Sequence, residues 1–264
     1  MAMNFTGKTA LITGASSGIG VEIAKGFAAR GANLVLVARR TQKLEAVAND
    51  IAAATGVKVT AITQDLSIAG ATAELEAKLA KSGTQVDILV NNAGFGTNER
   101  LVLEDRDRIA QEIRLNIGAL VDLTAAYLPG MIARDFGAIV NIASTASFQP
   151  VPGMAVYSST KAFVRNFTAS VWGELTTKNV RVLAVNPGAT QSEFFDVANA
   201  KPFGNLMPAQ AVVDTMFKAL DSRNPRPSVV VGGLNSLTAR LSAMMGTKAV
   251  TKVASKLYLK RDQL

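Results

Sequence analysis

Four polar side chains in this 264-residue sequence have the types and spacings that proton transfer requires. Tyr157 and Lys161 stand four positions apart in a stretch with helical spacing of apolar residues, so both project from one helix face. An ammonium beside a phenol favours the phenolate and lowers the tyrosine pKa from about 10 toward neutrality, as a general acid or base needs. Surface pairs share this spacing, so the pair alone does not decide between chemistry and an ordinary contact.

Two further residues favour chemistry at this pair. Ser144 ends an apolar run, where its hydroxyl can hydrogen-bond a carbonyl oxygen that Tyr157 protonates. Asn116 lies in an apolar helical stretch, and its amide could hold a water beside Lys161; the alternative is an interior amide satisfied by its neighbours. The chain has no His and no Cys, which excludes a Ser-His-Asp triad, a thiolate nucleophile and a His/Cys zinc site. Proton transfer therefore falls to Asp, Glu, Lys or Tyr or to a cofactor, and no metal site is predicted.

These side chains need a scaffold, and the sequence alternates strand and helix signals throughout. Near-continuous Val, Ile and Leu runs predict strands at residues 9–13, 33–38, 57–62, 86–90, 137–143, 179–185 and 227–232. Such runs are typical of strands covered on both faces, and their alternation with helices favours a parallel sheet of right-handed βαβ units. No linker or repeat divides the chain, so we expect one domain over residues 1–264.

The composition limits the classes of partner. It is globular, with 48% hydrophobic and 18% charged residues. The net charge of +8 is spread along the chain without interleaved aromatics, so we expect no nucleic-acid partner. No apolar run reaches the ~18 residues of a transmembrane helix, and the first residues predict a strand rather than a secretory signal. With the absence of cysteine, these features predict a cytoplasmic protein.

The turn after the first strand has the features of a phosphate-binding loop. Residues 13–20 read TGASSGIG, in which Gly14, Gly18 and Gly20 have G-x-x-x-G-x-G spacing. The glycines permit a tight turn and let the backbone approach a pyrophosphate at the N-terminus of the next helix. Ser16 and Ser17 could add hydroxyl contacts or simply cap that helix. An ordinary strand-to-helix turn is the alternative, and the position directly after the first strand favours a nucleotide.

Taken together, these motifs resemble the short-chain dehydrogenase/reductase family. The resemblance rests on TGASSGIG, NNAG at residues 91–94, Asn116, Ser144, Tyr157 with Lys161, and Pro187–Gly188, in the family's order and spacing. It covers residues 6 to 232 and implies a single Rossmann-fold domain, an α/β fold whose seven-stranded parallel sheet has the order 3-2-1-4-5-6-7 with helices on both faces. It also implies an oxidoreductase that interconverts a small-molecule carbonyl and a secondary alcohol and works as a homo-dimer or homo-tetramer.

The resemblance implies a role for each matching residue. Tyr157 would be the acid in carbonyl reduction, Lys161 would lower its pKa and bind the nicotinamide ribose, Ser144 would orient the carbonyl, and Asn116 would support a relay water. Besides Tyr157 and Lys161, the implied cofactor-binding residues are Gly14, Ser16, Ser17, Gly18, Ile19, Gly20, Arg39, Asp65, Leu66, Asn91, Ala93, Gly94, Pro187, Gly188, Thr190 and Ser192. Asn91 would also brace the sheet. Ser192 stands where the family often has Thr, so Thr190 is a second candidate for that contact.

The end of the second strand predicts the cofactor. An NAD site places an acid there to accept the ribose hydroxyls, but this chain has Ala38 followed by Arg39. A small residue followed by an arginine leaves room for a 2′-phosphate and offers it a charge-assisted partner, so we expect NADPH rather than NADH. Arg40 is expected to be a solvated strand end, because two successive side chains seldom reach one ligand.

The substrate contacts are expected from residues 189–210 and from four apolar side chains. Residues 189–210 mix apolar residues with Pro and Gly, as a mobile lid does. Ser144 with Phe95, Phe148, Val151 and Met154 would line the substrate pocket. The expected function is reduction of an apolar ketone or a 3-oxoacyl-type substrate. The alternative is a non-catalytic NADP-binding regulator. Such a protein would not need all four of Asn116, Ser144, Tyr157 and Lys161, and their presence therefore favours an enzyme.

The C-terminal extension, residues 234–264, is the least family-like part. Its apolar residues form a helical stripe, with Lys and Arg between them, at Leu234, Leu237, Leu241, Met244, Met245, Val250, Val253 and Leu257. We favour packing of this stripe on its own domain or on another subunit. The alternative is an anionic membrane surface, which would make the protein a membrane-surface reductase of a lipid-like substrate.

Overall fold

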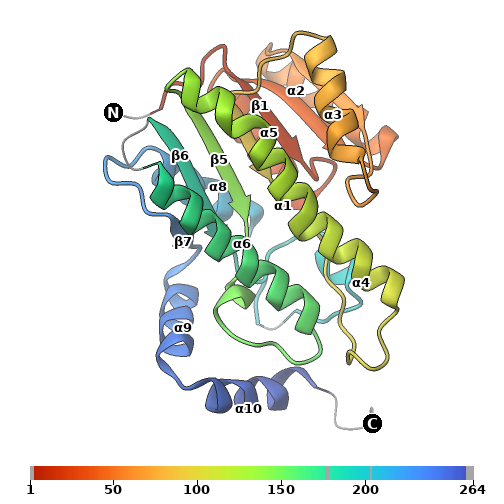
Figure 1. Ribbon diagram of the computed structural model, residues 1–264, viewed down its shortest axis with the longest axis vertical. Helices are drawn as coiled ribbons and strands as arrows, with labels where there is room; N and C mark the ends of the chain where they lie inside the picture. Colours follow the sequence, from red (N-terminus) through yellow and green to blue (C-terminus); the bar gives the residue numbers. More distant parts are fainter. Residues whose placement is uncertain (1–2, 176–178, 203, 260–264) are drawn as a thin grey trace.

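The computed structural model describes residues 3–175, 179–202 and 204–259. Four parts of the expected domain therefore lie outside the described residues: 1–2, 176–178, 203 and 260–264. Residue 203 belongs to the expected substrate loop, and residues 260–264 belong to the expected extension. The strands are β1 (Thr9–Thr13), β2 (Asn33–Ala38), β3 (Val59–Thr63), β4 (Ile88–Asn91), β5 (Gly137–Ile142), β6 (Val180–Asn186) and β7 (Ser228–Val230). All neighbours pair in parallel, in the order β3-β2-β1-β4-β5-β6-β7 (Figure 1). The predicted fold class is confirmed.

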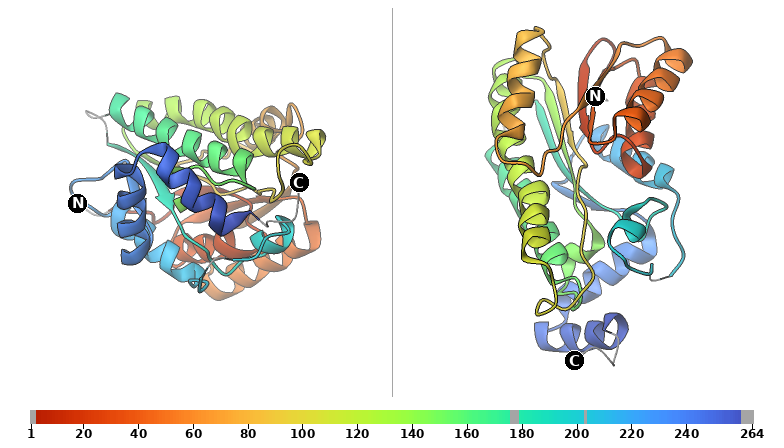
Figure 2. Two further views of the ribbon diagram at one scale, coloured as in Figure 1. Left: turned by 90° about the horizontal axis from the view of Figure 1, so that it is seen from below. Right: turned by 90° about the vertical axis from the view of Figure 1, so that its right-hand side faces the viewer.

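Burial on both faces explains the unbroken apolar strands. Successive residues of a strand point to opposite faces, so Leu11 and Ile12 in β1 enter different cores, and both are fully buried. One core packs under α1 (Gly18–Ala28), α2 (Thr41–Thr55) and α8 (Ala209–Leu220). The other packs under α3 (Ala71–Lys81), α5 (Leu120–Ala133) and α6 (Ala155–Glu174), so the sheet lies between two helix layers (Figure 2).

One long helical segment crosses the second core. It consists of α4 (Arg106–Ile113), a π-helical stretch η1 (Arg114–Ala119) and α5. The segment is 28 residues long, and the mean hydropathy of its most apolar window is 1.4. By length and composition alone it could cross a membrane, although the sequence analysis predicted no such helix. In the fold its apolar side chains Leu115, Leu123 and Met131 are buried against the sheet.

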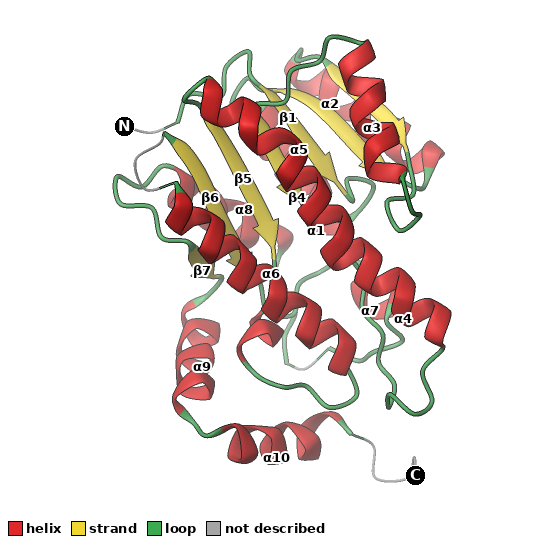
Figure 3. Ribbon diagram, viewed as in Figure 1, coloured by secondary structure: helices red, strands yellow, loops and turns green. Residues whose placement is uncertain are grey.

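The C-terminal extension forms two helices rather than one stripe. α9 (Gly233–Met244) and α10 (Thr247–Tyr258) are separated at Gly246, where the backbone is extended. Figure 3 shows both beyond the carboxyl ends of the strands, and in the view from below in Figure 2, α10 crosses those ends. Val250 and Ala254 are buried, whereas Leu237 and Leu241 stay at least half exposed. The stripe is therefore packed on its own domain only in part.

Candidate active site

A cavity of about 1610 Å³ opens at the carboxyl ends of the strands, where a parallel sheet places its ligands. Most of the predicted site residues line it: Gly14, Ser16, Ser17, Ile19, Arg39, Asp65, Leu66, Ala93, Gly94, Phe95, Ser144, Val151, Met154, Tyr157, Lys161, Pro187, Gly188, Thr190 and Ser192. The strand order brings these residues together from segments that are up to 178 positions apart, between Gly14 and Ser192.

Five predicted residues lie outside the lining: Gly18, Gly20, Asn91, Asn116 and Phe148. Gly20 packs so closely that a Cβ there would overlap the carbonyl oxygen of Gly14. Asn91 Nδ2 donates to Asn141 Oδ1 at 2.9 Å, which ties β4 to β5. Phe148 lies in the 3₁₀ turn η2 (Thr145–Phe148) with the Arg165 guanidinium 4.2 Å from its ring centroid, so it does not face the predicted substrate pocket.

Ser144 and Tyr157 meet at the floor of the cavity. Ser144 directly follows β5 and caps η2, where its Oγ accepts from the Ala146 amide at 3.1 Å. Tyr157 is in the first turn of α6, where the Ser144 hydroxyl lies close enough to the phenol for a hydrogen bond to lower its pKa. Removal from water raises the pKa of Tyr157 to about 12, although the hydrogen bond with Ser144 acts in the opposite direction. The hydroxyl therefore carries its proton at neutral pH.

Lys161 lies one turn further along α6 and is buried. Its Nζ donates to the carbonyl oxygen of Ile142 at 2.8 Å and lies 5.8 Å from the centroid of the Tyr157 ring. Burial lowers the pKa of Lys161 to about 8, partly offset by the charge of Glu112. Desolvation of the phenol is therefore the largest influence on its pKa in this arrangement, and the ammonium is directed at a backbone carbonyl. The expected lowering of the tyrosine pKa by Lys161 stays a prediction.

Asn116 sits in the π-helical stretch η1, a kind of distortion often found at functional sites. Its Oδ1 accepts from the Phe95 amide at 3.1 Å, and its Nδ2 donates to the Phe95 carbonyl at 2.8 Å and to Thr160 Oγ1 at 3.1 Å. Both amide hydrogens are therefore used by the protein. The side chain ties the segment after β4 to α6, as the neighbour-satisfied alternative expects, and the relay water stays a prediction.

Glu112 was not singled out from the sequence, yet it is fully buried one turn before Asn116. Thr97 Oγ1 donates to its Oε2 at 3.0 Å, and its Oε1 has no hydrogen-bond partner among the described residues. Burial raises the pKa of Glu112 to about 7, and its charge also raises the pKa values of Tyr157 and Lys161. The only signal for Glu112 in the sequence was its position one helical turn before Asn116, because a glutamate in a polar helix is normally expected to be exposed.

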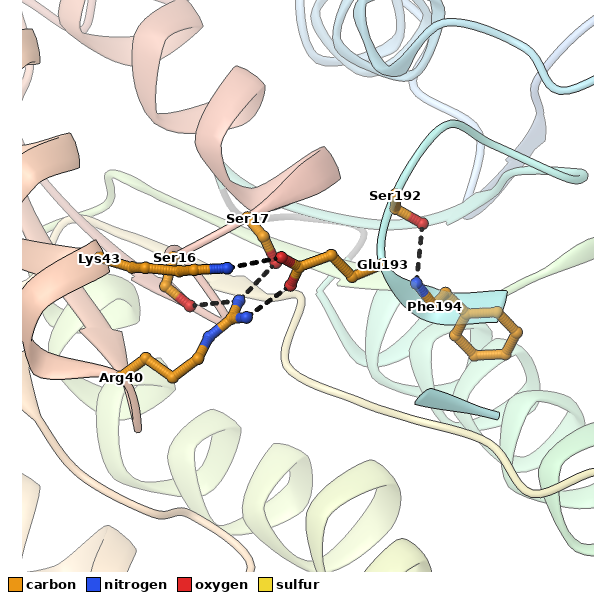
Figure 4. Close-up of polar contacts among 7 residues, drawn as sticks. All are labelled: Ser16, Ser17, Arg40, Lys43, Ser192, Glu193 and Phe194. Carbon is orange, nitrogen blue, oxygen red and sulfur yellow. Dashed lines mark hydrogen bonds and ion pairs between the residues drawn. The ribbon is translucent and has the colours of Figure 1, made fainter. Parts of the chain in front are cut away.

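The nucleotide end of the cavity is cationic and closely packed. A Cβ on Gly14 would meet Ala93 Cα at 2.9 Å, so only a glycine lets this turn pack so closely on the segment after β4. Arg39 Nη1 lies 3.8 Å from Asp65 Oδ2. Arg40, expected to be a solvated strand end, instead hydrogen-bonds both Ser16 and Ser17 (Figure 4), because the turn after β1 lies beside the end of β2. Two guanidinium groups, two hydroxyls and a helix N-terminus fit a phosphate-bearing dinucleotide.

A lid segment, residues 189–202 and 204–207, lines the other side of the cavity. Backbone hydrogen bonds of 2.9 Å from Gln191 to Met207 and from Met207 to Ala189 close its base. The short helix α7 (Phe194–Val197) within it places the Phe194 ring 5.0 Å from the Tyr157 ring. Phe194 therefore adds an aromatic wall beside the tyrosine, a contact that the sequence did not indicate.

Comparisons with known proteins agree with this geometry. Residues 8–202 match the family model described as short chain dehydrogenase. A short chain dehydrogenase of Pseudocercospora fijiensis is 37% identical over 189 residues, which cover 71% of this chain and 61% of that protein. A very-long-chain 3-oxoacyl-CoA reductase of Rattus norvegicus is 30% identical over 265 residues, covering 97% of this chain and 84% of that protein. A short-chain dehydrogenase from Sphingobium yanoikuyae, solved in complex with NADPH, has a TM-score of 0.80 and 34% identity, covering 97% of this chain and 98% of that one.

Proposed function

Because the chain belongs to the short-chain dehydrogenase/reductase family, we propose that it is an NADPH-dependent reductase of a carbonyl group on a large apolar substrate, either a ketone or a 3-oxoacyl compound. The observation that carries this proposal is that Ser144, Tyr157 and Lys161 line one cavity, with Ser144 beside the phenol and Lys161 one helical turn from it.

The pair is arranged to deliver a proton. NADPH, when bound, supplies the hydride that reduces the carbonyl carbon. The Ser144 hydroxyl orients the carbonyl oxygen, and Tyr157 transfers its phenolic proton to that oxygen, so that the product is a secondary alcohol. With a pKa raised to about 12, Tyr157 holds the proton until the oxygen becomes basic. The buried Lys161, whose pKa is lowered to about 8, then stands beside the phenolate as the nearest cation.

The cationic end of the cavity supports NADPH over NADH. Arg39 and Arg40 both line it, next to Ser16 and Ser17 of the glycine-rich turn. Ala38 leaves this end without the acid that would repel a 2′-phosphate. The residues that would hold the phosphate are therefore basic and hydroxylic, and the helix N-terminus of α1 faces the same space.

The substrate end of the cavity supports an apolar substrate. Phe95, Val151 and Met154 line it together with Phe194 of the lid segment. Leu234 of α9 and Leu257 of α10 extend this apolar lining to the C-terminal helices. A cavity of about 1610 Å³ exceeds the ~300–1,000 Å³ of an ordinary ligand site, so it has room for a long substrate beside a dinucleotide.

An oxidation assay of the nicotinamide tests this proposal. NADPH consumption is followed at saturating cofactor with 3-oxoacyl thioesters of increasing chain length, apolar ketones and steroids, and each reaction is repeated with NADH. We expect kcat/KM to rise with chain length or apolar bulk and to be higher with NADPH. Equal use of NADH, or preference for small polar carbonyls, would contradict the proposal.

A second candidate function, a reductase that works at a membrane surface, is favoured by one observation. Five apolar side chains on or next to α9 are at least 48% exposed: Leu234, Leu237, Leu241, Met244 and Met245. The last turn of α10 adds Lys256 beside the half-exposed Leu257. Sedimentation with anionic and neutral vesicles, using the full chain and the double variant Leu237→Ser, Leu241→Ser, tests this candidate. Equal recovery of both proteins in the supernatant would dismiss it.

The resemblance to the family also leads us to propose a homo-dimer or homo-tetramer in the cytoplasm. The exposed apolar side chains Ile113 on α4 and Phe163 on α6 offer a surface for such an assembly. Light scattering of the purified chain gives the number of subunits, and a monomeric mass would contradict this proposal.

A further inference from the structure

Two cations after β2 and one carboxylate of the lid segment form a closed cluster at the edge of the cofactor site (Figure 4). Arg40 Nη1 lies 2.6 Å from Glu193 Oε2, and Lys43 Nζ lies 2.8 Å from Glu193 Oε1. The same arginine donates from Nη2 to Ser16 Oγ at 3.1 Å and to Ser17 Oγ at 2.9 Å. Glu193 therefore connects the lid segment to α2 and to the glycine-rich turn.

The donors around Glu193 are those that bind phosphate. A guanidinium and an ammonium contact one carboxylate that carries a single charge, and two hydroxyls bond the same guanidinium. The cluster lies at the end of β2, which in this fold faces the adenosine ribose. The hydrogen bond from Lys43 is the main reason that the pKa of Glu193 is held near 2, so the carboxylate is ionised at any working pH.

The two ion pairs are suited to exchange. The side chains of Arg40, Lys43 and Glu193 are 42%, 56% and 39% exposed, so solvent screens both pairs and each is weak. A phosphate group carries about −1.5 to −2 charges near neutral pH and has three acceptor oxygens. It therefore competes successfully with one carboxylate for the same cations.

Glu193 also fixes the residues on either side of it. Ser192 packs against the glycine-rich turn, where a Cβ on Gly18 would lie 2.7 Å from the Ser192 Cβ. Phe194 follows directly, and its ring packs at a tilt of 48° against the Tyr157 ring. Holding Glu193 thus holds the lid segment between the phosphate-binding turn and the tyrosine, and releasing it frees both contacts.

We propose that Glu193 is an internal competitor for the 2′-phosphate of the cofactor: its carboxylate occupies Arg40 and Lys43, a 2′-phosphorylated nucleotide replaces it, and the lid segment is thereby released. A nucleotide without that phosphate leaves the ion pairs in place. This makes Glu193 and Lys43 determinants of cofactor specificity, and it rests on the NADPH dependence proposed above. Arg40 becomes a phosphate ligand rather than a solvated strand end.

Calorimetric binding of two nucleotide fragments to the full chain tests the proposal without catalysis. The probes are 2′,5′-ADP, which carries the 2′-phosphate, and 5′-ADP, which does not. We expect Glu193→Gln to bind 2′,5′-ADP about fivefold more tightly than the unmodified chain, because the competing carboxylate charge is gone. This corresponds to about 1 kcal/mol in binding free energy. The affinity for 5′-ADP should change less than twofold.

A charge-matched control separates exchange from a general field effect. Asp196 lies three residues further along the same segment and is exposed, so Asp196→Asn removes the same charge without touching the cluster. We expect it to change 2′,5′-ADP affinity less than twofold. The proposal would be overturned if both variants bound 2′,5′-ADP more tightly to the same extent, or if Glu193→Gln bound it with unchanged or lower affinity. Lower affinity would show that Glu193 helps to hold the bound nucleotide.

Hydrogen exchange of the lid amides provides a second readout. Adding 2′,5′-ADP to the unmodified chain should speed amide exchange in residues 193–199, whereas adding 5′-ADP should not. The Glu193→Gln variant should show the faster exchange without any ligand. Slower exchange with 2′,5′-ADP would overturn the release step. If the unmodified chain bound neither probe, both the cofactor assignment and the competitor would be wrong. If it bound 2′,5′-ADP and Glu193→Gln changed nothing, only the competitor would be wrong.

Discussion

Replacing Glu112 with glutamine should stabilise the protein at pH 8 and leave its stability almost unchanged at pH 5. Burial raises the pKa of Glu112 to about 7 in the folded chain, where one carboxyl oxygen has no hydrogen-bond partner among the described residues, whereas the ordinary glutamate pKa of 4.5 applies once the chain unfolds. Between these values the unfolded state binds fewer protons than the folded one, so the free energy of unfolding falls as pH rises. The loss is about 1.4 kcal/mol per pH unit, or about 3 kcal/mol over the window.

Glutamine cannot lose a proton there, and its side-chain oxygen can still accept from Thr97. For a chain of 264 residues, about 3 kcal/mol corresponds to roughly 5 °C in Tm. Thermal unfolding of both proteins from pH 5 to pH 8 by circular dichroism measures the difference, with Glu45→Gln, an exposed position on α2, as control. The reasoning is refuted if the Tm difference between Glu112→Gln and the unmodified chain does not grow with pH, or if the control shows the same growth.

Three further outcomes follow from the packing and charge of the site. Gly20→Ala should lower Tm and NADPH affinity together, because its Cβ would overlap the Gly14 carbonyl; wild-type values in calorimetry and nucleotide titration would contradict this. Arg39→Asp should reverse or erase the NADPH preference in kcat/KM ratios, since an acid would then face the 2′-phosphate, and an unchanged ratio would remove Arg39 from the phosphate site. Phe148→Ala should leave KM within about twofold, while Met154→Ala, which alters the cavity wall, should raise it; the opposite order would restore Phe148 to the pocket.

The elements of the fold could be predicted because both faces of the sheet are buried. Strands such as β1 and β5 show no polar alternation, and their limits were predicted to within one residue. β3 is an edge strand whose residues are at most partly buried, so its apolar signal is weaker, and it starts two residues later than expected. The break at Gly246 between α9 and α10 was missed because apolar spacing continues across it.

The site was predictable where one local motif carries the chemistry. TGASSGIG occupies eight consecutive residues from the end of β1 to the start of α1, and Tyr157 and Lys161 lie one turn apart on α6. The cluster around Glu193 could not be found in this way, because Lys43 and Glu193 are 150 positions apart and meet only when the lid segment folds over α2. The raised pKa of Tyr157 was equally hidden, since it depends on how far the surrounding chain removes the phenol from water.

The central claim is that Tyr157 donates the proton in an NADPH-dependent carbonyl reduction. Tyr157→Phe keeps the ring that packs beside Phe194 and removes only the hydroxyl beside Ser144. Single-turnover reduction and NADPH titration on the same preparation measure both consequences. We predict that the rate falls at least about 100-fold while NADPH affinity stays within twofold. A variant that reduces substrate within tenfold of the unmodified rate would contradict the account.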